Sequence, residues 1–278
     1  MHRTKQIIAV VAVVLLMGFL FAQPIKGLVN EDRGTTDAAA SGDTRAITLE
    51  IASQQAKRGL NASLIEEISE LESQVAEASG EEKLGFLQEL ATKWDDVNEP
   101  APMGFVYEEM AKISPEFTYW LQAGDAYRTA YTNLQDTTAA RALNDYAINA
   151  YEQALEIDQN NLDAKAGLGS AYVTGTNNPM AGITLLREVV EANPDHIEAN
   201  RSLGLFSMQS RQFDRAIDRF KKVISLEPDA ESYFYLATSY ENIGLNQEAI
   251  AAFEKSRDLA ADPTLTQFID RKIEELRK

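Results

Sequence analysis

The stretch NRSLGLFSMQSRQFDRAIDRFKKVISLEP, residues 200–228, decides the fold of this chain. Leu203-Gly204 lies on a first helical pattern, and Ala216, Phe220 and Pro228 follow on a second. The same order of residues occurs upstream at Leu168-Gly169, Gly182, Leu186 and Pro194, and downstream at Leu236-Ala237, Ala249 and Phe253. The interval is about 33 to 35 residues, which is the period expected of a solenoid of helical hairpins.

Each unit of such a solenoid buries its apolar face only against its neighbours, so chain length alone sets no domain count. Working outward from residues 200–228, the pattern predicts an all-α chain with five hairpins and a closing helix that shields the last apolar face. The predicted hairpins are 81–116, 117–161, 162–195, 196–229 and 230–263, and the closing helix is 264–278.

The second hairpin contains about 11 extra residues relative to a 34-residue unit. Asp136-Thr137-Thr138, in the middle of this insertion, is a helix-capping sequence. We therefore expect both helices to lengthen and the hairpin to project beyond its neighbours. The projecting tip is either a contact for a partner or an insertion without a role.

The start of the fourth hairpin carries a second capping signal. Asp195 is followed three residues later by Glu198, which resembles a capping box. This spacing supports a helix boundary at Pro194 and a first helix over residues 196–209.

The segment before the hairpins, residues 46–80, is also helical in pattern. Leu64, Ile68, Leu71 and Val75 alternate in steps of four and three residues, which places them on one stripe. Two heptads are too few for a coiled coil, so we expect these helices to pack on the array. The alternative is a self-associating structural membrane protein that dimerises through the stripe on residues 62–78.

The N-terminal segment predicts a membrane anchor or an export signal. An uninterrupted apolar run over residues 7–22 follows a basic leader, residues 1–6. We expect a transmembrane helix over residues 7–28 and a flexible linker, rich in Gly, Ala, Ser and Thr, over residues 29–45.

A cleaved signal peptide is the competing interpretation of this run. Leu20-Phe21-Ala22 places a bulky residue where a signal peptidase site requires a small one, which favours the uncleaved anchor. Both interpretations leave the basic leader in the cytoplasm and carry the repeats across the membrane. We therefore expect a single-pass protein whose repeat domain is extracytoplasmic, and periplasmic if the source is bacterial.

The composition excludes several classes of function. A formal net charge of -17 repels phosphate backbones, so nucleic acid is not an expected partner. The chain has no cysteine and only two histidines, His2 in the basic leader and His196 at a predicted helix start, so we expect no metal-ligating histidine pair. The sequence contains no phosphate-binding glycine loop, and the adjacent carboxylates Glu66-Glu67 diverge on a helix. We expect no catalytic residue, no metal and no cofactor, and the chain is not predicted to be an enzyme.

The repeat itself resembles the tetratricopeptide repeat (TPR), in which Leu-Gly and Tyr on one helix precede Ala, an aromatic and Pro on the next. Residues 200–228 depart from this pattern with Asn200 in place of a large residue and Ser207 in place of the tyrosine. The similarity extends over roughly residues 84–263. It implies a right-handed superhelical solenoid, here preceded by a transmembrane helix and a short linker. The matching residues of this unit are Leu203, Gly204, Ala216, Phe220, Val223 and Pro228.

In this family the first helices line a concave groove that takes peptides or partner helices. The resemblance therefore implies a membrane-anchored scaffold for protein–protein interaction, in envelope assembly, secretion or cytochrome maturation. Only Arg128 and Arg201 are basic in the expected groove, which argues against capture of a peptide's terminal carboxylate. The register directs eight residues into the groove: Asp125, Arg128, Arg201, Leu205, Met208, Phe234, Thr238 and Glu241.

Overall fold

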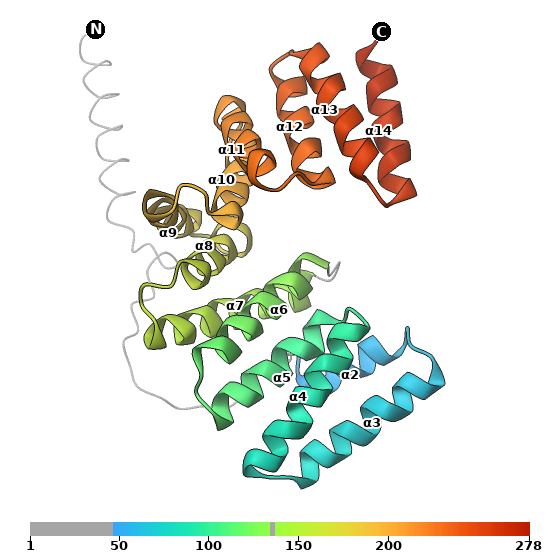
Figure 1. Cartoon of the computed structure of the whole chain (residues 1–278), viewed down its shortest axis with the longest axis vertical. Coiled ribbons are helices and arrows are strands. Elements are labelled where there is room, and N and C mark those ends of the chain that lie inside the picture. The colour runs from blue at the N-terminus through green and yellow to red at the C-terminus, as the bar shows by residue number, and fades with distance from the viewer. Residues whose placement is uncertain (1–46, 134–136) are drawn as a thin grey trace, which may run out of the picture. The chain divides into compact units, whose positions relative to one another are not determined.

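The computed structural model describes residues 47–133 and 137–278 (Figure 1). The expected leader, anchor and linker, residues 1–45, lie outside the described residues. Among the helices that are described, none is both long enough and apolar enough to cross a bilayer.

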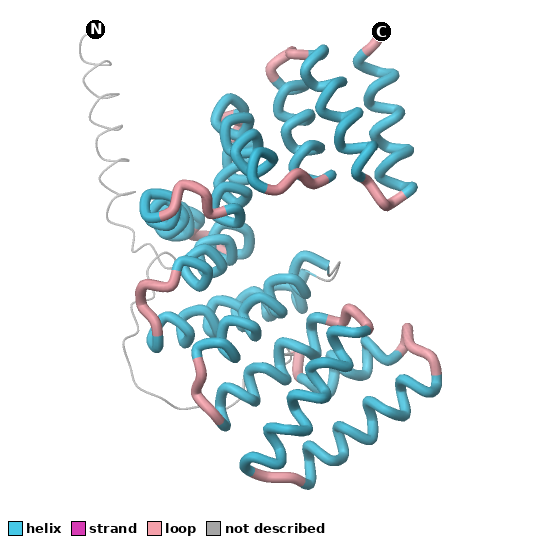
Figure 2. Tube along the Cα trace, viewed as in Figure 1, coloured by secondary structure: helices cyan, strands magenta, loops and turns pink. Residues whose placement is uncertain are grey.

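The described residues form thirteen α-helices and no strand, so the all-α prediction is confirmed for this part of the chain (Figures 1 and 2). Their bounds are α2 Leu49–Lys57, α3 Ala62–Glu77, α4 Gly80–Asp96, α5 Pro100–Ile113, α6 Phe117–Asn133, α7 Thr137–Ile157, α8 Leu162–Gly175, α9 Pro179–Ala192, α10 Ile197–Gln209, α11 Phe213–Leu226, α12 Ala230–Asn242, α13 Asn246–Leu259 and α14 Pro263–Leu276.

The helices from α4 to α13 form five antiparallel hairpins in chain order. Within each hairpin the two helices pack together, and each second helix also packs on the first helix of the next hairpin. The first helices α6, α8, α10 and α12 contact one another in succession. Below, "inner face" means the side of these first helices that their own second helices leave uncovered.

Small residues allow the close helix crossings that the repeat pattern predicts. A Cβ atom added at Gly182 on α9 would lie 2.3 Å from the backbone oxygen of Gly169 on α8. Gly204 faces Phe220, whose ring would be 2.9 Å from an added Cβ. These positions must stay small because the neighbouring backbone or ring already occupies the space.

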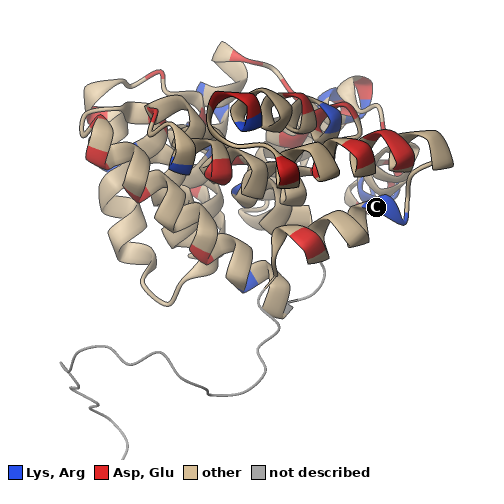
Figure 3. Cartoon of the chain, turned by 90° about the horizontal axis from the view of Figure 1, so that it is seen from below, with Lys and Arg blue, Asp and Glu red and all other residues tan. Residues whose placement is uncertain are grey.

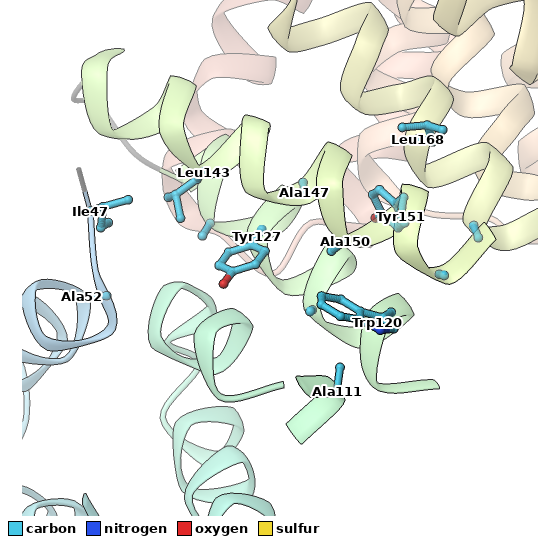
Figure 4. Packing of buried hydrophobic residues seen from close by; sticks show 14 residues of the cluster. Ile47, Ala52, Ala111, Trp120, Tyr127, Leu143, Ala147, Ala150, Tyr151 and Leu168 are labelled. Atoms are coloured by element: carbon cyan, nitrogen blue, oxygen red, sulfur yellow. The ribbon is translucent and has the colours of Figure 1, made fainter. Parts of the chain in front are cut away.

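Aromatic side chains fill the gaps between the hairpins. Trp120, Tyr127 and Tyr151 lie in one buried cluster that also takes in Ile47 and Leu168 (Figure 4). Tyr127 and Tyr151 are fully buried, so each joins several helices into one core.

The helices before the first hairpin pack on the same unit. Ile68, Leu71 and Val75 of α3 are buried in one cluster with Leu87 and Trp94 of α4. The apolar stripe considered for dimerisation is therefore covered within a single chain. Helix α2 packs on α5 in its turn.

The second hairpin is longer than its neighbours, as the insertion predicts. Helix α6 has 17 residues and α7 has 21, whereas α8 and α9 have 14 each. Helix α7 begins at Thr137, within the capping sequence, and residues 134–136 lie outside the described part.

The capping box at Asp195 is wrong. Helix α10 begins at Ile197, and its N-cap is His196, whose Nδ1 accepts a hydrogen bond from the Ala199 backbone N–H at 3.3 Å. Asp195 is therefore one residue too early to cap the helix, and its carboxylate pairs with Lys222. Glu198 turns toward the inner face instead of back to the helix end.

Helix α14 closes the array. Ile269 and Ile273 are buried in a cluster with Phe253 of α13, so its apolar side covers the last hairpin. Phe268 precedes Ile269 on α14 but points to a different side of the helix, and its side chain is 39% exposed.

Candidate functional site

The eight residues predicted to face the groove all lie on first helices. Asp125 and Arg128 are on α6, three more are on α10, and Phe234, Thr238 and Glu241 are on α12. Their surroundings differ along the array: the middle of the inner face is closed by its own side chains, whereas the C-terminal end is open.

A polar network closes the middle. The Arg128 guanidinium on α6 donates to Glu198 Oε1 on α10 at 3.2 Å. From α8, which lies between these helices, Ser170 Oγ donates to the same carboxylate oxygen at 3.2 Å. Ser202 Oγ on α10 also donates to it at 3.2 Å. Side chains of three successive first helices therefore converge on one carboxylate.

Tyr151, on the second helix α7, also belongs to this network. Its hydroxyl donates to Asp125 Oδ1 at 2.7 Å and accepts from Arg128 Nε at 3.2 Å. The ring occupies the space beside Gly167 on α8, where an added Cβ would lie 2.3 Å from the Tyr151 Cζ atom. Below, "polar bridge" means the six residues of this network: Asp125, Arg128, Tyr151, Ser170, Glu198 and Ser202.

The charge states of Arg128 and Tyr151 suit the hydrogen bonds of the polar bridge. Burial raises the pKa of the Tyr151 hydroxyl well above its ordinary value, and the neighbouring Asp125 carboxylate raises it further. Burial lowers the pKa of Arg128, but the Glu198 carboxylate and Tyr151 more than offset this, so its net pKa is raised. Arg128 therefore remains a cation and Tyr151 a neutral donor.

Asp125 has mixed surroundings. Its side chain is exposed, yet enough protein lies around the carboxyl to desolvate it in part, and this raises its pKa despite the hydrogen bond from Tyr151 and the charge of Arg128. Asp125 also borders a shallow hollow of about 410 Å³ between α4, α5 and α6, together with Trp94, Asp95 and Glu99. This hollow is acidic, because the only charged residues that line it are carboxylates.

The C-terminal end of the inner face keeps a shallow hollow of about 580 Å³ between α12 and α14. The Phe234 and Phe268 rings lie 5.9 Å apart, centre to centre, and both border it. At its rim Lys272 Nζ lies 2.9 Å from Glu241 Oε1. Below, "C-terminal hollow" means its lining residues: Phe234, Thr238, Glu241, Asn242, Phe268 and Lys272.

The remaining candidates on α10 continue this surface. Leu205 and Met208 are half-buried and pack against the same apolar cluster as Phe234. Arg201 donates to Asp229 Oδ2 at 3.2 Å, so its charge is already paired.

Phe268 and Lys272 were not among the predicted groove residues, because the closing helix over residues 264–278 was expected only to shield the last hairpin. A signal was present: the two residues are four apart and share one helix face, offset from the buried pair Ile269 and Ile273. Helix α14 thus buries one side and adds an aromatic and a cation to the inner face with the other.

The charge distribution matches the acidic composition. Asp and Glu side chains are spread over many helices, with fewer Lys and Arg among them (Figure 3). Within the described ranges no three His, Cys, Asp or Glu side chains gather in a way that could hold a metal ion.

Comparison with known proteins identifies the repeat. A family model described as tetratricopeptide repeat matches residues 207–264. No curated protein sequence is significantly similar to the chain.

Solved structures show the same fold. A tetratricopeptide repeat protein from Parabacteroides merdae ATCC 43184 is similar with a TM-score of 0.57 and 16% identity, over 82% of this chain and 86% of that chain. A thermophilic TPR protein from Thermus thermophilus gives a TM-score of 0.53 and 15% identity, over 69% and 98% of the two chains. YrrB, described as a TPR protein with an unusual peptide-binding site, gives 0.44 and 20% identity, over 67% and 91%. The first two structures show that the array has the fold of a tetratricopeptide repeat solenoid, and residues 207–264 match the repeat family itself.

Proposed function

We propose that this tetratricopeptide repeat protein is a membrane-tethered scaffold that binds a protein partner through the C-terminal hollow. One observation carries the proposal: Phe234 and Phe268 border a hollow on the inner face that no other part of the described chain fills. Phe268 is 39% exposed, although covering an aromatic ring with protein lowers the free energy.

The rest of the inner face narrows the choice of site. The polar bridge uses the donors and acceptors of α6, α8 and α10 on one another, so a partner would have to break them to bind there. The C-terminal hollow needs no such rearrangement. Its Lys272–Glu241 pair at the rim offers both a donor and an acceptor to a peptide backbone.

The chemistry of the C-terminal hollow suits a peptide segment with one apolar or aromatic side chain. Such a side chain would cover the two phenylalanine rings, and buried aromatic anchors of this kind dominate the binding energy of many interfaces. Leu205 and Met208 on α10 extend the apolar surface along the peptide's path. A disordered segment or an amphipathic helix of the partner fits this description.

Residues 7–28 supply the tether in this proposal, and the repeats lie on the extracytoplasmic side. The uninterrupted apolar run and the basic leader support this arrangement. We place the scaffold in envelope assembly, secretion or cytochrome maturation, by analogy of layout with other anchored repeat proteins.

Photo-crosslinking in cells tests the binding site. A benzoylphenylalanine residue replaces Thr238 in the full-length chain, and crosslinked proteins are identified by mass spectrometry. We expect one reproducible partner, whose yield falls at least about tenfold when Phe268→Ala is added, since a buried aromatic anchor contributes roughly 2 kcal/mol or more. The matched control places the same crosslinker at Lys255, an exposed residue of α13 outside the inner face.

Two outcomes would contradict the proposal. One is a set of crosslinks at Thr238 no different from those at Lys255. The other is a partner whose yield is unchanged by Phe268→Ala while the variant keeps its helical circular dichroism.

The absence of cysteine from the sequence makes topology easy to test. Lys278→Cys, at the exposed end of the chain, provides a unique thiol. We expect it to react with a membrane-impermeant maleimide in intact cells, or in spheroplasts if an outer membrane blocks access. Reaction only after permeabilisation of the inner membrane would place the repeats in the cytoplasm.

A further inference from the structure

A third hollow lies on a different side of α10, between α9 and α11, with a volume of about 690 Å³. Asn200, Leu203 and Ser207 of α10 line it, and their spacing of three and four residues puts them on one helix face. Arg201, Leu205 and Met208, one or two positions further on, belong to the inner face. The hollow is therefore separate from the site proposed above.

The hollow exists because one hairpin departs from the repeat pattern. Ser207 is a serine where the other four hairpins carry a large aromatic side chain four residues after the Leu-Gly position. A serine leaves most of that volume empty. The corresponding residues are Trp94, Tyr127, Tyr172 and Tyr240.

Asn200 is the second departure, and it also lines the hollow. It is 1% exposed, and its amide nitrogen donates to the backbone oxygens of Pro194 at 3.0 Å and His196 at 2.9 Å. Its side-chain oxygen accepts from Arg219 at 2.8 Å. The other hairpins carry an apolar side chain or a longer one here: Leu87, Trp120, Lys165 and Tyr233.

The walls of the hollow are basic in a chain of net charge -17. Arg187 projects from α9, and Arg215 and Arg219 project from α11. Within the residues that the structure describes, none of these three arginines forms a salt bridge, although twelve such pairs are present, one of them at Lys222 of the same hollow. Arg219 is held by neutral Asn200, and Arg215 donates to the Gln212 amide at 2.6 Å.

The other charged groups of the hollow do not cancel this charge. Lys222 is paired with Asp195, and Asp218 is exposed at the rim. Burial lowers the pKa of Arg219, and repulsion by the neighbouring Arg187 lowers it further; Asp218 raises it but does not offset these two effects, so the net pKa is lowered. An anion placed between them would relieve this repulsion.

Apolar side chains complete the lining. Ile183 and Leu203 are buried at the base, and Met180 is 58% exposed at the edge. A free inorganic anion would leave this apolar surface bare. A flexible methionine beside arginines suits a peptide that carries both an apolar side chain and carboxylates.

We propose that this arginine hollow, formed by Arg187, Arg215 and Arg219 with Asn200 and Ser207, binds an acidic peptide segment of a second protein. The carboxylates of the peptide pair with the three arginines, and an adjacent apolar side chain lies against Met180 and Leu203. The scaffold then holds two partners, one in the C-terminal hollow and one between α9 and α11.

The test selects peptides from a random phage-displayed library on the full-length chain in detergent. Ser207→Tyr restores the residue type of the other hairpins and fills the hollow, so it serves for counter-selection. We expect the peptides lost on this variant to carry at least two carboxylates beside an apolar residue. Their affinity should fall at least about tenfold, since each lost arginine–carboxylate contact removes a charge-assisted bond.

A second variant keeps the test independent of repacking. Arg187→Gln with Arg215→Gln changes two exposed side chains and should weaken the same peptides at least about tenfold without altering the fold. The matched control, Arg141→Gln with Lys255→Gln, removes the same charge from exposed positions on α7 and α13 and should leave binding within about twofold.

Three outcomes would overturn the proposal. The first is enrichment of neutral or basic peptides by the wild-type chain but not by Ser207→Tyr. The second is binding of acidic peptides that both variants leave unchanged. The third is tight binding of inorganic phosphate, by calorimetry, with no enrichment of acidic peptides. Because the proposed function is measured at Thr238 and Phe268, its failure is distinguishable from each of these.

Discussion

The middle and the C-terminal end of the inner face share one repeat register but differ in access. On α8 the three register positions are Ala166, Ser170 and Val173, whose exposed fractions are 0%, 4% and 8%. On α12 the same positions are Phe234, Thr238 and Glu241, all only half-buried. The difference teaches that these positions set how closely successive first helices approach, and hence whether a groove remains.

The physical reason is the size of the side chains on α8. Gly167 and Ser170 leave room for Tyr151 and for the Arg128–Glu198 contact, so side chains of α6 and α10 meet across α8. The bulkier residues on α12 leave a gap that α14 borders without filling. Packed interiors leave little free volume, so one helix of small residues is enough to close a groove.

The largest expected effect comes from breaking the close crossing under the middle region. Gly182→Ala places a Cβ atom 2.3 Å from the Gly169 backbone oxygen, which cannot move without separating α8 from α9. We expect a loss of about 3 kcal/mol in the free energy of unfolding, measured by urea titration with circular dichroism.

Gly85→Ala is the matched control for this substitution. Gly85 lies in α4, and an added Cβ atom there meets nothing within 4 Å. This change should stabilise the chain by about 1 kcal/mol through helix propensity. An equal response of the two variants would mean that the crossing at Gly182 is looser than described.

The next effect concerns the polar bridge. Tyr151→Phe keeps the ring but removes the hydroxyl that links Asp125 with Arg128, and should cost about 1.5 kcal/mol. Tyr172→Phe removes a hydroxyl that bonds exposed Glu152 at 3.0 Å and should cost less than about 0.5 kcal/mol. Equal urea midpoints for the two variants would mean that the Tyr151 hydroxyl does not stabilise the polar bridge.

A smaller effect on stability is expected at the open end. Phe268→Ala removes a ring that is already 39% exposed, so the free energy of unfolding should change by less than about 1 kcal/mol. Partner crosslinking at Thr238 should nevertheless fall. Leu259→Ala, at a residue 48% exposed on α13, should change neither quantity appreciably. A large loss of stability in Phe268→Ala would make the ring part of the core.

The smallest effect is a pH dependence. Burial raises the pKa of Asp125 in the folded chain above its ordinary value of 3.8, so the folded state holds this proton more tightly than the unfolded state. The contribution of Asp125 to stability is therefore greatest below pH 3.8 and is lost as the pH rises through the raised pKa. In urea titrations over pH, the wild-type chain should therefore lose stability relative to Asp125→Asn as the pH rises from 3.8 through the raised pKa. A wild-type chain that gains stability relative to the variant over this range would mean that the pKa is lowered.

Part of the fold and of the site followed from residue patterns. The repeat of Leu203-Gly204 and Ala216 along the chain predicted the all-α solenoid, because a period near 34 residues leaves few other ways to bury an apolar face. The capping residues at Asp136-Thr137-Thr138 predicted the lengthened α6 and α7. Both signals are local, so a linear sequence shows them.

The errors arose where distant segments meet. The capping box failed because His196 and Glu198 have partners on α8 and α6, which lie 33 and 70 residues away in the sequence. Phe268 was missed because its place beside Phe234 depends on how α14 docks. Asn200 and Ser207 indicated an irregularity at the arginine hollow. Their departures from the repeat pattern do not show which cations surround the empty volume.

By itself, the sequence determined the class of fold, the helical hairpins and the residues that each first helix turns toward its neighbours. Periodicity and residue size suffice for these, since they act within one turn or one hairpin. Only the tertiary structure decided that the inner face is closed at α8 and open at α12. It also decided that three arginines, which form no salt bridge among the described residues, line a separate hollow between α9 and α11. These features depend on distances between hairpins, which are set by the packing of side chains that lie far apart along the chain.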